Sequence, residues 1–521
     1  MRDVIYLKLK NTGLIIGFIV FFIFLTIFII NAYKSKSLNN SYVSTIIVPH
    51  HDLVAKQRQE VFEKIAPKTQ NRRIILLAPN HYNSGTANIQ TRLQTFTTQY
   101  GDIKVDDSLF KLVSSYGAEE TNSTFEAEHG IKALLPDIAK YYPNSNILPL
   151  VIKQTSSQKE LNNLLSALNK NCQDCLMFVS ADFSHYQPYL LSKLHDELTI
   201  RGLQNLDGEL LDTKAELEPM HHVWMAVKWA ELHNTEHFEL AKHTFSHEVL
   251  KDFYAEGTTH IMGWYERGQP AKSNSSVSFA IAGSLNFNSG ETKKNQNLPT
   301  LFNQLGERVL WGTDLVLGNL KLVIPANKKI VDILKPLRFT HFYSQHNELV
   351  KNIDANILNK LDIVSGQGQQ IKIFSGGASQ ISVEKIKENQ ASNIIIYADW
   401  DLNNKQQRQE LAHKWIDNGA DMVIGINDEE ISEIELYENR PIAYSLGSFV
   451  SLNKPDGYSM VVAGEFTNDE INLLPMLIKT QNSQPILARS AEADQILAKY
   501  FAQFKLFETD NKGGMLYSLP K

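Results

Sequence analysis

The sequence contains little cysteine and has no excess of basic charge. Its two cysteines, Cys172 and Cys175, are too few for a disulfide-rich scaffold or a cysteine-rich zinc site. Its 57 acidic residues outnumber its 51 lysines and arginines, which gives a formal net charge of -6 at pH 7. Because nucleic-acid binding requires a basic surface, this balance argues against a nucleic acid as the partner.

Charge is absent altogether from the run Gly13–Ile30, GLIIGFIVFFIFLTIFII. A helix of roughly 17 to 25 apolar residues is long enough to cross a lipid bilayer. No small-residue cleavage site follows the run, which favours an uncleaved transmembrane anchor at 13–31 over a signal peptide with an unusual core. We therefore expect a single-pass protein of the cell membrane, with residues 1–12 in the cytoplasm and the soluble domains outside it.

Strand-like apolar runs alternate with helix-length segments in the rest of the chain, for example TIIVP, RIILLAP, ILPLVI and LMFVSA. This alternation predicts layered α/β domains with largely parallel sheets. The polar stretch ERGQPAKSNSSVS indicates a boundary between two domains. The expected organisation is a tether at 32–43, a first domain at 44–267, a linker at 268–276, a second domain at 277–491 and a tail at 492–521.

Three strand-like runs of the first domain each end near a histidine: His50 in VPHHD, His81 in APNHYNSG and His185 in ADFSHY. The carboxyl ends of parallel strands meet at one edge of a sheet, and functional residues gather there. Imidazole is the commonest protein ligand of metal ions, so converging histidines could hold one ion. For each histidine taken singly, a structural role is the alternative.

Five blocks of the first domain occur in a family's order: VPHHD, LLAPNHYNSG, EAEHGIKALLPDIAKYYP, VSADFSHY and THIMGWY. They resemble the Memo-like family, also called AmmeMemoRadiSam system protein B, over about 45–267. The resemblance implies a fold like that of the class III extradiol dioxygenases, which hold non-haem iron through two histidines and a carboxylate. In the Memo-like relatives it implies a metal site of two histidines and a cysteine.

The resemblance makes His50 and His81 the two histidine ligands of a metal ion. The family's cysteine block is absent, and Met220 stands near that position, followed by His221 and His222. Either an imidazole of this pair is the third ligand, or the site has changed or been lost. The implied cofactor is a single transition-metal ion, and iron, copper and zinc all suit a histidine-rich site.

The same resemblance places two further blocks in the cleft of the metal. We expect His185 to transfer protons or contact the substrate, and Asp182 to orient a neighbour or cap a turn. Glu128 and His129 precede an apolar helical pattern and could contact a ligand or cap the helix. If the chain is an enzyme, these four residues are its catalytic candidates, and the chemistry would be metal-dependent oxidation or hydrolysis.

Cys172 and Cys175 form a C-x-x-C pair that precedes a strand. A redox-active pair stands at the N-terminus of a helix, so that context is missing. We expect a structural pair, bonded as a disulfide if the domain lies outside the cytoplasm. A metal role for the two thiols is the weaker alternative.

Three blocks of the second domain, GTDLVLGNLK, QRQELAHKWIDNGADMVIG and ELYENRPIAYSLGSFV, resemble the CapA family of capsule and poly-gamma-glutamate synthesis proteins. The resemblance covers about 277–487 and implies a calcineurin-like metallophosphoesterase fold, which holds two cations through Asp, Asn and His. At the matching positions little more than Asn319 remains, and Lys321 stands beside it. Asp399, Asp428 and Glu429 could form a different cation site, but we expect a domain that keeps a binding or scaffolding surface.

The fold class expected overall is α/β, with an N-terminal membrane helix, an extradiol-dioxygenase-like domain and a metallophosphoesterase-fold domain. Two functions follow from this organisation. The first is a membrane-anchored metalloprotein whose first domain is catalytic. The second is a non-catalytic protein of the cell envelope, whose two domains bind a capsule polymer, polyglutamate or another envelope protein. A working phosphoesterase is disfavoured by the substitutions in the second domain.

Overall fold

The structure is a computed structural model, and it describes residues 42–521 except 219, 272–274, 288–300, 304, 306–308, 323–333, 345–362, 403, 427, 453–455 and 509–511. Within these residues, no helix is long and apolar enough to cross a membrane. The longest, α8 (Tyr189–Gln204), has 16 residues and carries charged side chains. The expected fold class is therefore corrected: the described residues form a mixed α/β fold, and none of their helices could span a membrane. The helix predicted at 13–31 lies outside the described residues.

The first domain is built on a nine-stranded sheet of order β10-β11-β1-β8-β2-β7-β3-β6, in which β9 pairs with β11. Four parallel strands form its centre and are buried along their whole length: β1 (Val43–Val48), β8 (Leu176–Ser180), β2 (Ile74–Pro79) and β7 (Ile147–Ile152). Their continuous apolar runs are typical of strands covered on both faces. The other strands are β3 (Ile89–Thr91), β6 (Glu119–Glu120), β9 (His185–Gln187), β10 (His237–Phe245) and β11 (Gly257–Glu266), with a separate pair of β4 (Phe96–Thr98) and β5 (Gly101–Ile103).

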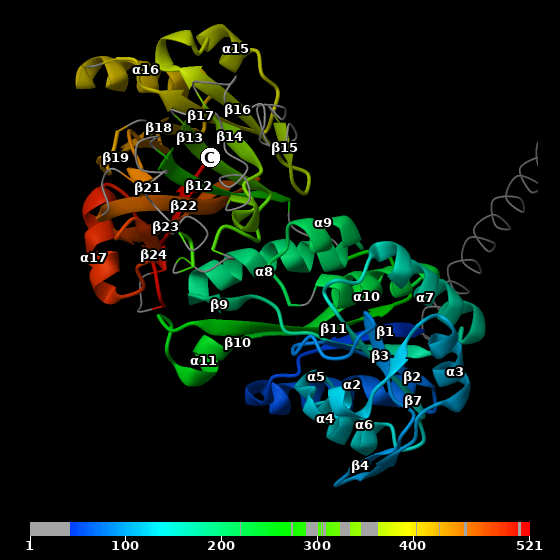
Figure 1. Cartoon of the computed structure of the whole chain (residues 1–521). Coiled ribbons are helices and arrows are strands. Elements are labelled where there is room, and N and C mark those ends of the chain that lie inside the picture. The colour runs from blue at the N-terminus through cyan, green and yellow to red at the C-terminus, as the bar shows by residue number, and fades with distance from the viewer. Residues whose placement is uncertain are drawn as a thin grey trace, which may run out of the picture.

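Helices cover both faces of this sheet and give the domain three layers (Figure 1). One face shares a buried core with α3 (Asp107–Ser115), α7 (Gln158–Asn171) and α10 (Met220–Leu232). The opposite face packs against α2 (Ala55–Thr69) and α6 (Leu135–Tyr141). The shorter helices are η1 (Asp52–Val54), α4 (Asn122–Ala127), α5 (His129–Lys132), α9 (Gly208–Thr213) and α11 (Ser246–Leu250).

Helix α7 shows how the local sequence specifies these elements. The Ser157 side chain caps its N-terminus by accepting from the Glu160 amide at 3.2 Å. A stripe of leucines from Leu161 to Leu168 follows the helical period and is buried against the sheet. Beyond the helix, a disulfide joins Cys172 to Cys175, and both residues are buried. This agrees with the predicted structural pair.

The second domain contains two sheets packed on a common core. The nine-stranded sheet has the order β14-β13-β12-β22-β23-β26-β25, and the six-stranded sheet has the order β15-β16-β17-β18-β20-β19. Apolar side chains from β12, β22 and β23 meet those from β17 and β18 between the sheets. The segment expected to be a tail, 492–521, contributes most of α17 and both β25 and β26 to this domain.

The bounds of the elements of the second domain are as follows. The larger sheet contains β12 (Ser276–Phe287), β13 (Leu315–Leu322), β14 (His341–Tyr343), β21 (Ser448–Ser451), β22 (Gly457–Thr467), β23 (Glu470–Gln481), β24 (Gln484–Leu487), β25 (Leu506–Glu508) and β26 (Leu516–Pro520). The smaller sheet contains β15 (Ile363–Ser365), β16 (Gln370–Gly377), β17 (Asn393–Asp399), β18 (Met422–Ile426), β19 (Ile434–Tyr437) and β20 (Arg440–Ala443). The helices are η3 (Lys335–Leu337), η4 (Ala378–Gln380), α15 (Val383–Lys387), α16 (Lys405–Asp417) and α17 (Ala491–Tyr500).

Helix α8 of the first domain packs against the second domain. Its first residues, Tyr189, Leu190 and Leu191, belong to a buried cluster that also contains residues of β12, β22 and β23. Further along the helix, the Arg201 guanidinium donates to Asp314 Oδ1 at 2.6 Å, and both side chains are nearly fully buried. The domains therefore share a core in addition to being joined by the chain.

Candidate metal centre

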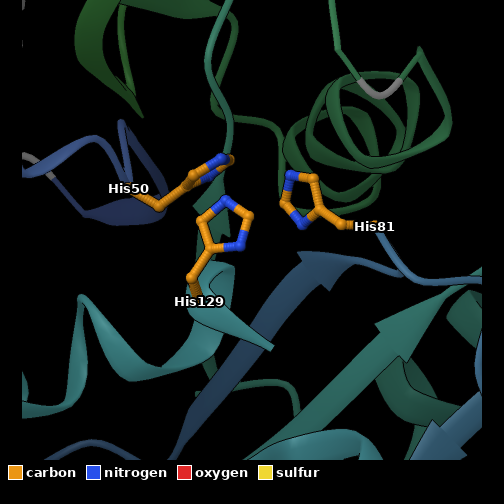
Figure 2. Close-up of side chains that lie close together, drawn as sticks. All are labelled: His50, His81 and His129. Atoms are coloured by element: carbon orange, nitrogen blue, oxygen red, sulfur yellow. The ribbon is translucent and has the colours of Figure 1, made fainter. Parts of the chain in front are cut away.

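Three histidines converge at the carboxyl edge of the first sheet. His50 and His81 each follow a strand by two residues, β1 and β2, and these strands flank β8. His129 is the first residue of α5. One ligand nitrogen from each of the three lies within 4.8 Å of the others, and Figure 2 shows the three rings side by side. The parallel register of the sheet thus brings His50 and His81 to the same edge, and α5 adds His129, which lies 79 positions after His50.

The three rings differ in exposure. The ring centroids of His81 and His129 are 4.0 Å apart, and each lies 5.0 Å from the centroid of His50. The side chain of His50 is buried, that of His81 is 13% exposed and that of His129 is 50% exposed. The group is therefore closed towards the sheet and open to solvent at His129.

Glu128 fixes the orientation of His81. The His81 Nδ1 lies 2.6 Å from Glu128 Oε1, while the amides of His81 and Gly130 donate to the two carboxylate oxygens at 3.0 and 2.9 Å. Burial alone would raise the pKa of Glu128, but these hydrogen bonds outweigh it and lower the pKa. Glu128 is thus a carboxylate that accepts the Nδ1 proton. This leaves the Nε2 lone pair of His81 available, as in many metal sites.

Ser180 fixes the orientation of His50 in the same way. The Ser180 hydroxyl donates its single proton to the Gly130 carbonyl at 2.6 Å, so at 3.1 Å it can only accept from His50 Nδ1. Burial lowers the pKa of His50 to about 4, so the ring is neutral at pH 7. The lone pair of Nε2 then faces Asp182 Oδ2 across 3.3 Å. Two acceptors face each other here, and a cation beside them would satisfy both.

His185 has the opposite hydrogen-bond environment. Its Nδ1 contacts the Phe183 carbonyl, and its Nε2 lies 2.9 Å from Glu218 Oε2. Burial would lower the pKa of His185, but the nearby carboxylates, Glu218 first among them, outweigh it and raise the pKa. Because acceptors face both nitrogens, this environment favours the doubly protonated ring. The other oxygen of Glu218 lies 3.9 Å from His81 Nε2, so this pair borders the histidine group.

Sequence reasoning missed Ser180, Glu218 and His260. His260 is fully buried, and its Nδ1 lies 3.4 Å from the Asp182 carboxylate. The Asp182 carboxylate thus lies between two buried imidazole rings, those of His50 and His260. Glu218 can be recognised only in the three-dimensional structure, where an isolated β-bridge pairs its backbone with that of Asp182.

The structure does not bring His221 and His222 into the group of three. The His221 Nε2 lies 3.0 Å from the Gln154 carbonyl, and its Nδ1 lies 3.5 Å from Asp212. The Asp212 carboxylate raises the pKa of His221. Burial lowers the pKa of His222, which is 1% exposed, to about 3.

Comparison with known families covers both domains. Residues 24–252 match the family described as Memo-like protein, and residues 312–453 match the family described as bacterial capsule synthesis protein PGA_cap. The chain is a fusion of a Memo-like domain and a PGA_cap domain. The resemblances noted in both halves of the sequence are therefore confirmed.

Proteins of the MEMO1 family match part of the chain. A MEMO1 family protein of Caldivirga maquilingensis is 28% identical over 182 residues, which are 33% of this chain and 63% of that protein. A MEMO1 family protein of Aquifex aeolicus is 28% identical over 176 residues, which are 33% of this chain and 64% of that protein. The chain thus spans less than two thirds of these relatives. Among solved structures, an uncharacterized protein from Escherichia coli K12 covers 43% of this chain and 100% of its own, with 12% identity and a TM-score of 0.31.

The PGA_cap domain has a different set of residues at the ends of its strands. Asn319 donates to the Ser284 hydroxyl at 2.9 Å, between the paired strands β12 and β13. Lys321 lies in the field of Asp399, Glu429 and Asp428. Burial lowers the pKa of Lys321, and these carboxylates oppose the shift. An ammonium group thus supplies positive charge among the carboxylates of this domain.

Proposed function

We propose that the Memo-like domain binds one transition-metal ion, iron, copper or zinc, through His50, His81 and His129. The observation that carries this proposal is the convergence of three imidazole nitrogens within 4.8 Å. Ser180 and Glu128 hold the outer nitrogens of two rings, so that the inner lone pairs are free for a cation. The facing acceptors of His50 and Asp182 fit the same cation.

We further propose that the centre is catalytic. Catalytic metal sites keep a coordination position open, and His129 opens this group to solvent. A metal ion bound there would supply Lewis-acid activation of a bound water or substrate, or redox chemistry if it is iron or copper. His185 borders the group in an environment that favours the doubly protonated ring, so it would act as a proton donor at Nε2, with Glu218 holding the ring in place.

For the PGA_cap domain we propose a non-catalytic binding role, towards a polymer or protein of the cell envelope. Lys321 supports this role, because its charge replaces a cation among Asp399, Asp428 and Glu429. We also propose that both domains work outside the cytoplasm. The Cys172–Cys175 disulfide supports that location, because such bonds persist in oxidising compartments.

Elemental analysis tests the metal proposal. The full-length chain, purified without a metal-affinity tag, is compared with a His50→Ala, His81→Ala double variant. A His221→Ala, His237→Ala double variant is the matched control, since it removes two histidines outside the group. We expect about one metal ion per chain in the native and control proteins and none in the His50/His81 variant. A native protein that stays metal-free after reconstitution with iron, copper and zinc would contradict the proposal.

A further inference from the structure

The connection between α9 and α10 of the Memo-like domain, residues 214–218, carries two carboxylates that contact His185. It forms neither a helix nor a strand of a sheet, apart from the isolated bridge at Glu218. Both oxygens of the fully buried Glu216 accept from the His185 amide at 3.2 Å. Glu218 Oε2 lies 2.9 Å from His185 Nε2. The backbone and the ring of His185 therefore both depend on where this connection lies.

The PGA_cap domain holds the start of this connection through three hydrogen bonds. Arg338 Nη1 donates to the carbonyls of Thr213 and Ala215 at 3.0 and 3.3 Å. The Gly312 amide donates to the Lys214 carbonyl, between these two, at 3.0 Å. In Figure 1, α8 and α9 lie on the side of the Memo-like domain that faces the PGA_cap domain. Because a segment without regular structure depends on outside donors for its carbonyls, the PGA_cap domain helps to set its conformation.

Arg338 is itself held in place. Its guanidinium lies 3.6 Å from the centre of the Trp311 ring, and the Trp311 indole donates to the Pro336 carbonyl at 2.7 Å. A guanidinium stacked on an aromatic ring keeps its plane, which fixes the direction of its donors. Arg338 therefore presents Nη1 to the connection in one orientation.

A second contact between the domains lies behind Glu216. His195 Nδ1 is 3.6 Å from Glu216 Oε2, and both side chains are fully buried. Gly312 has a φ of +68° and brings the backbone of the PGA_cap domain against the His195 ring, where an added Cβ would lie 2.5 Å from Cγ. No side chain fits between them, so the PGA_cap domain closes the space behind the carboxylate that holds the His185 amide.

A third contact lies next to His185 along the chain. Tyr186 has a left-handed φ of +58° and sits at the register shift between β9 and β11. The Arg489 guanidinium of the PGA_cap domain donates to its carbonyl at 3.5 Å and to the Glu256 carboxylate at 2.6 Å. The PGA_cap domain thus contacts both segments that determine the position of His185.

We propose that Arg338 of the PGA_cap domain is a positioning residue for His185 of the Memo-like domain. It acts on the backbone of the connection and, through it, on the two carboxylates that hold the amide and the ring of His185. Hydrogen bonds weaken steeply with distance and angle, so a small shift of the connection would loosen the ring. This inference rests on the proposed role of His185 as proton donor, and it gives the PGA_cap domain a part in that chemistry.

NMR of the His185 ring tests this role in the full-length chain. The chain carries isotope-labelled histidine and is stripped of metal with a chelator, so the readout is independent of the metal proposal. The ring proton between Nε2 and Glu218 is assigned by its absence in His185→Gln, and its exchange with water is measured. We expect about tenfold faster exchange in Arg338→Met, the effect of losing one hydrogen bond. Trp311→Leu, which removes the ring beneath Arg338, should act in the same direction more weakly.

Arg440→Met is the matched control. Arg440 Nη1 also donates to two backbone carbonyls, those of Asn439 and Pro520, but both belong to the PGA_cap domain itself. This variant should leave the exchange of the His185 ring proton unchanged. Native exchange in both Arg338→Met and Trp311→Leu, or an equal effect in Arg440→Met, would overturn the inference alone. Absence of a protected ring proton in the native chain would overturn the proton-donor role together with it.

Discussion

The two domains end their parallel strands in polar residues, but those residues are used in opposite ways. In the Memo-like domain, Ser180 and Glu128 bond the outer nitrogens of His50 and His81, so that the other ring nitrogens point into the histidine group. In the PGA_cap domain, Asn319 bonds Ser284, and the ammonium of Lys321 lies among carboxylates. The strand ends of the Memo-like domain are thus short of positive charge, whereas those of the PGA_cap domain include the positive charge of Lys321.

This difference shows what a strand-end site needs in order to take a cation. Ligand residues alone are insufficient, because their lone pairs must also be kept free of protons and of internal cations. In the Memo-like domain this depends on residues behind the ligands. In the PGA_cap domain, Lys321 and Arg408 supply positive charge to the carboxylates Asp399, Asp428 and Glu429.

Removal of the third imidazole is the largest expected disruption of this contrast. We expect His129→Ala to weaken metal binding by more than about 100-fold, beyond the usual effect of losing an outer-shell partner. Competition with a chelator of known affinity measures the loss. His221→Ala is the control, because His221 faces Asp212 and Gln154 instead. Native affinity in the His129 variant would show that this histidine is not a ligand.

Loss of a residue behind the ligands should have a smaller effect. Ser180→Ala removes the group that fixes His50 Nδ1, and we expect metal affinity to fall by about 10- to 100-fold while stoichiometric loading persists at high metal concentration. Ser184→Ala is a matched control, since Ser184 is also fully buried but its hydroxyl has no hydrogen-bond partner among the described residues. Equal affinities in the two variants would mean that the tautomer of His50 is not set by Ser180.

The PGA_cap side of the comparison can be tested through stability. Lys321→Met would remove the positive charge nearest in effect to Asp399 and Glu429, while Asp428 keeps its ion pair with Arg408, and we expect the free energy of unfolding at pH 7 to fall by about 1–3 kcal/mol. Urea denaturation at pH 7 measures this change. Lys385→Met, at an exposed lysine of the same domain, should have little effect. An unchanged stability would mean that Lys321 does not compensate the carboxylates.

The smallest expected effect concerns His221 and His222, two of the histidines outside the metal group. Native His222 has a pKa of about 3, whereas an unfolded histidine has a pKa of about 6.5. Below pH 6.5 the unfolded chain therefore binds more protons, so this residue makes stability fall as the pH drops. Between pH 7.5 and 5.5 we expect a loss of about 1 kcal/mol from this source, and its absence in His222→Leu.

The contribution of His221 to stability should change with pH in the opposite direction, so this residue serves as the comparison. Its pKa is raised by Asp212, so its stabilising effect is present below pH 6.5 and is lost as the pH rises through its native pKa. Urea unfolding of His221→Leu and His222→Leu at both pH values should shift the pH dependence in opposite directions. Parallel shifts would contradict this assignment of the two environments.

Much of the fold was accessible from the sequence because it depends on local patterns. Continuous apolar runs predicted the buried parallel strands, and the strand ends pointed to His50 and His81. Ser180 and Glu218 were not accessible in this way. Their contacts depend on which strands are neighbours and on the bridge between Asp182 and Glu218.

The helix that begins at Met220 shows the limit of the resemblance. It suggested that His221 or His222 could replace the missing cysteine ligand, but the orientation of the helix takes His221 to Asp212 and buries His222. The membrane helix was an inference from length and hydropathy alone, and no such helix occurs in the part of the chain that the structure describes. The sequence pattern contained no information on the direction of the His221 and His222 side chains or on the place of their helix in the fold.

The cluster that α8 shares with the PGA_cap domain has a consequence for modularity. Separation of the two halves near Arg267 would uncover Tyr189, Leu190 and Leu191, which lie in a core with β12, β22 and β23. Uncovered apolar patches of this kind favour aggregation. The halves have therefore lost the independence of ordinary fused modules. If a truncated chain fails to yield soluble protein, the cause would be the exposure of this shared core and not a defect in the Memo-like half itself.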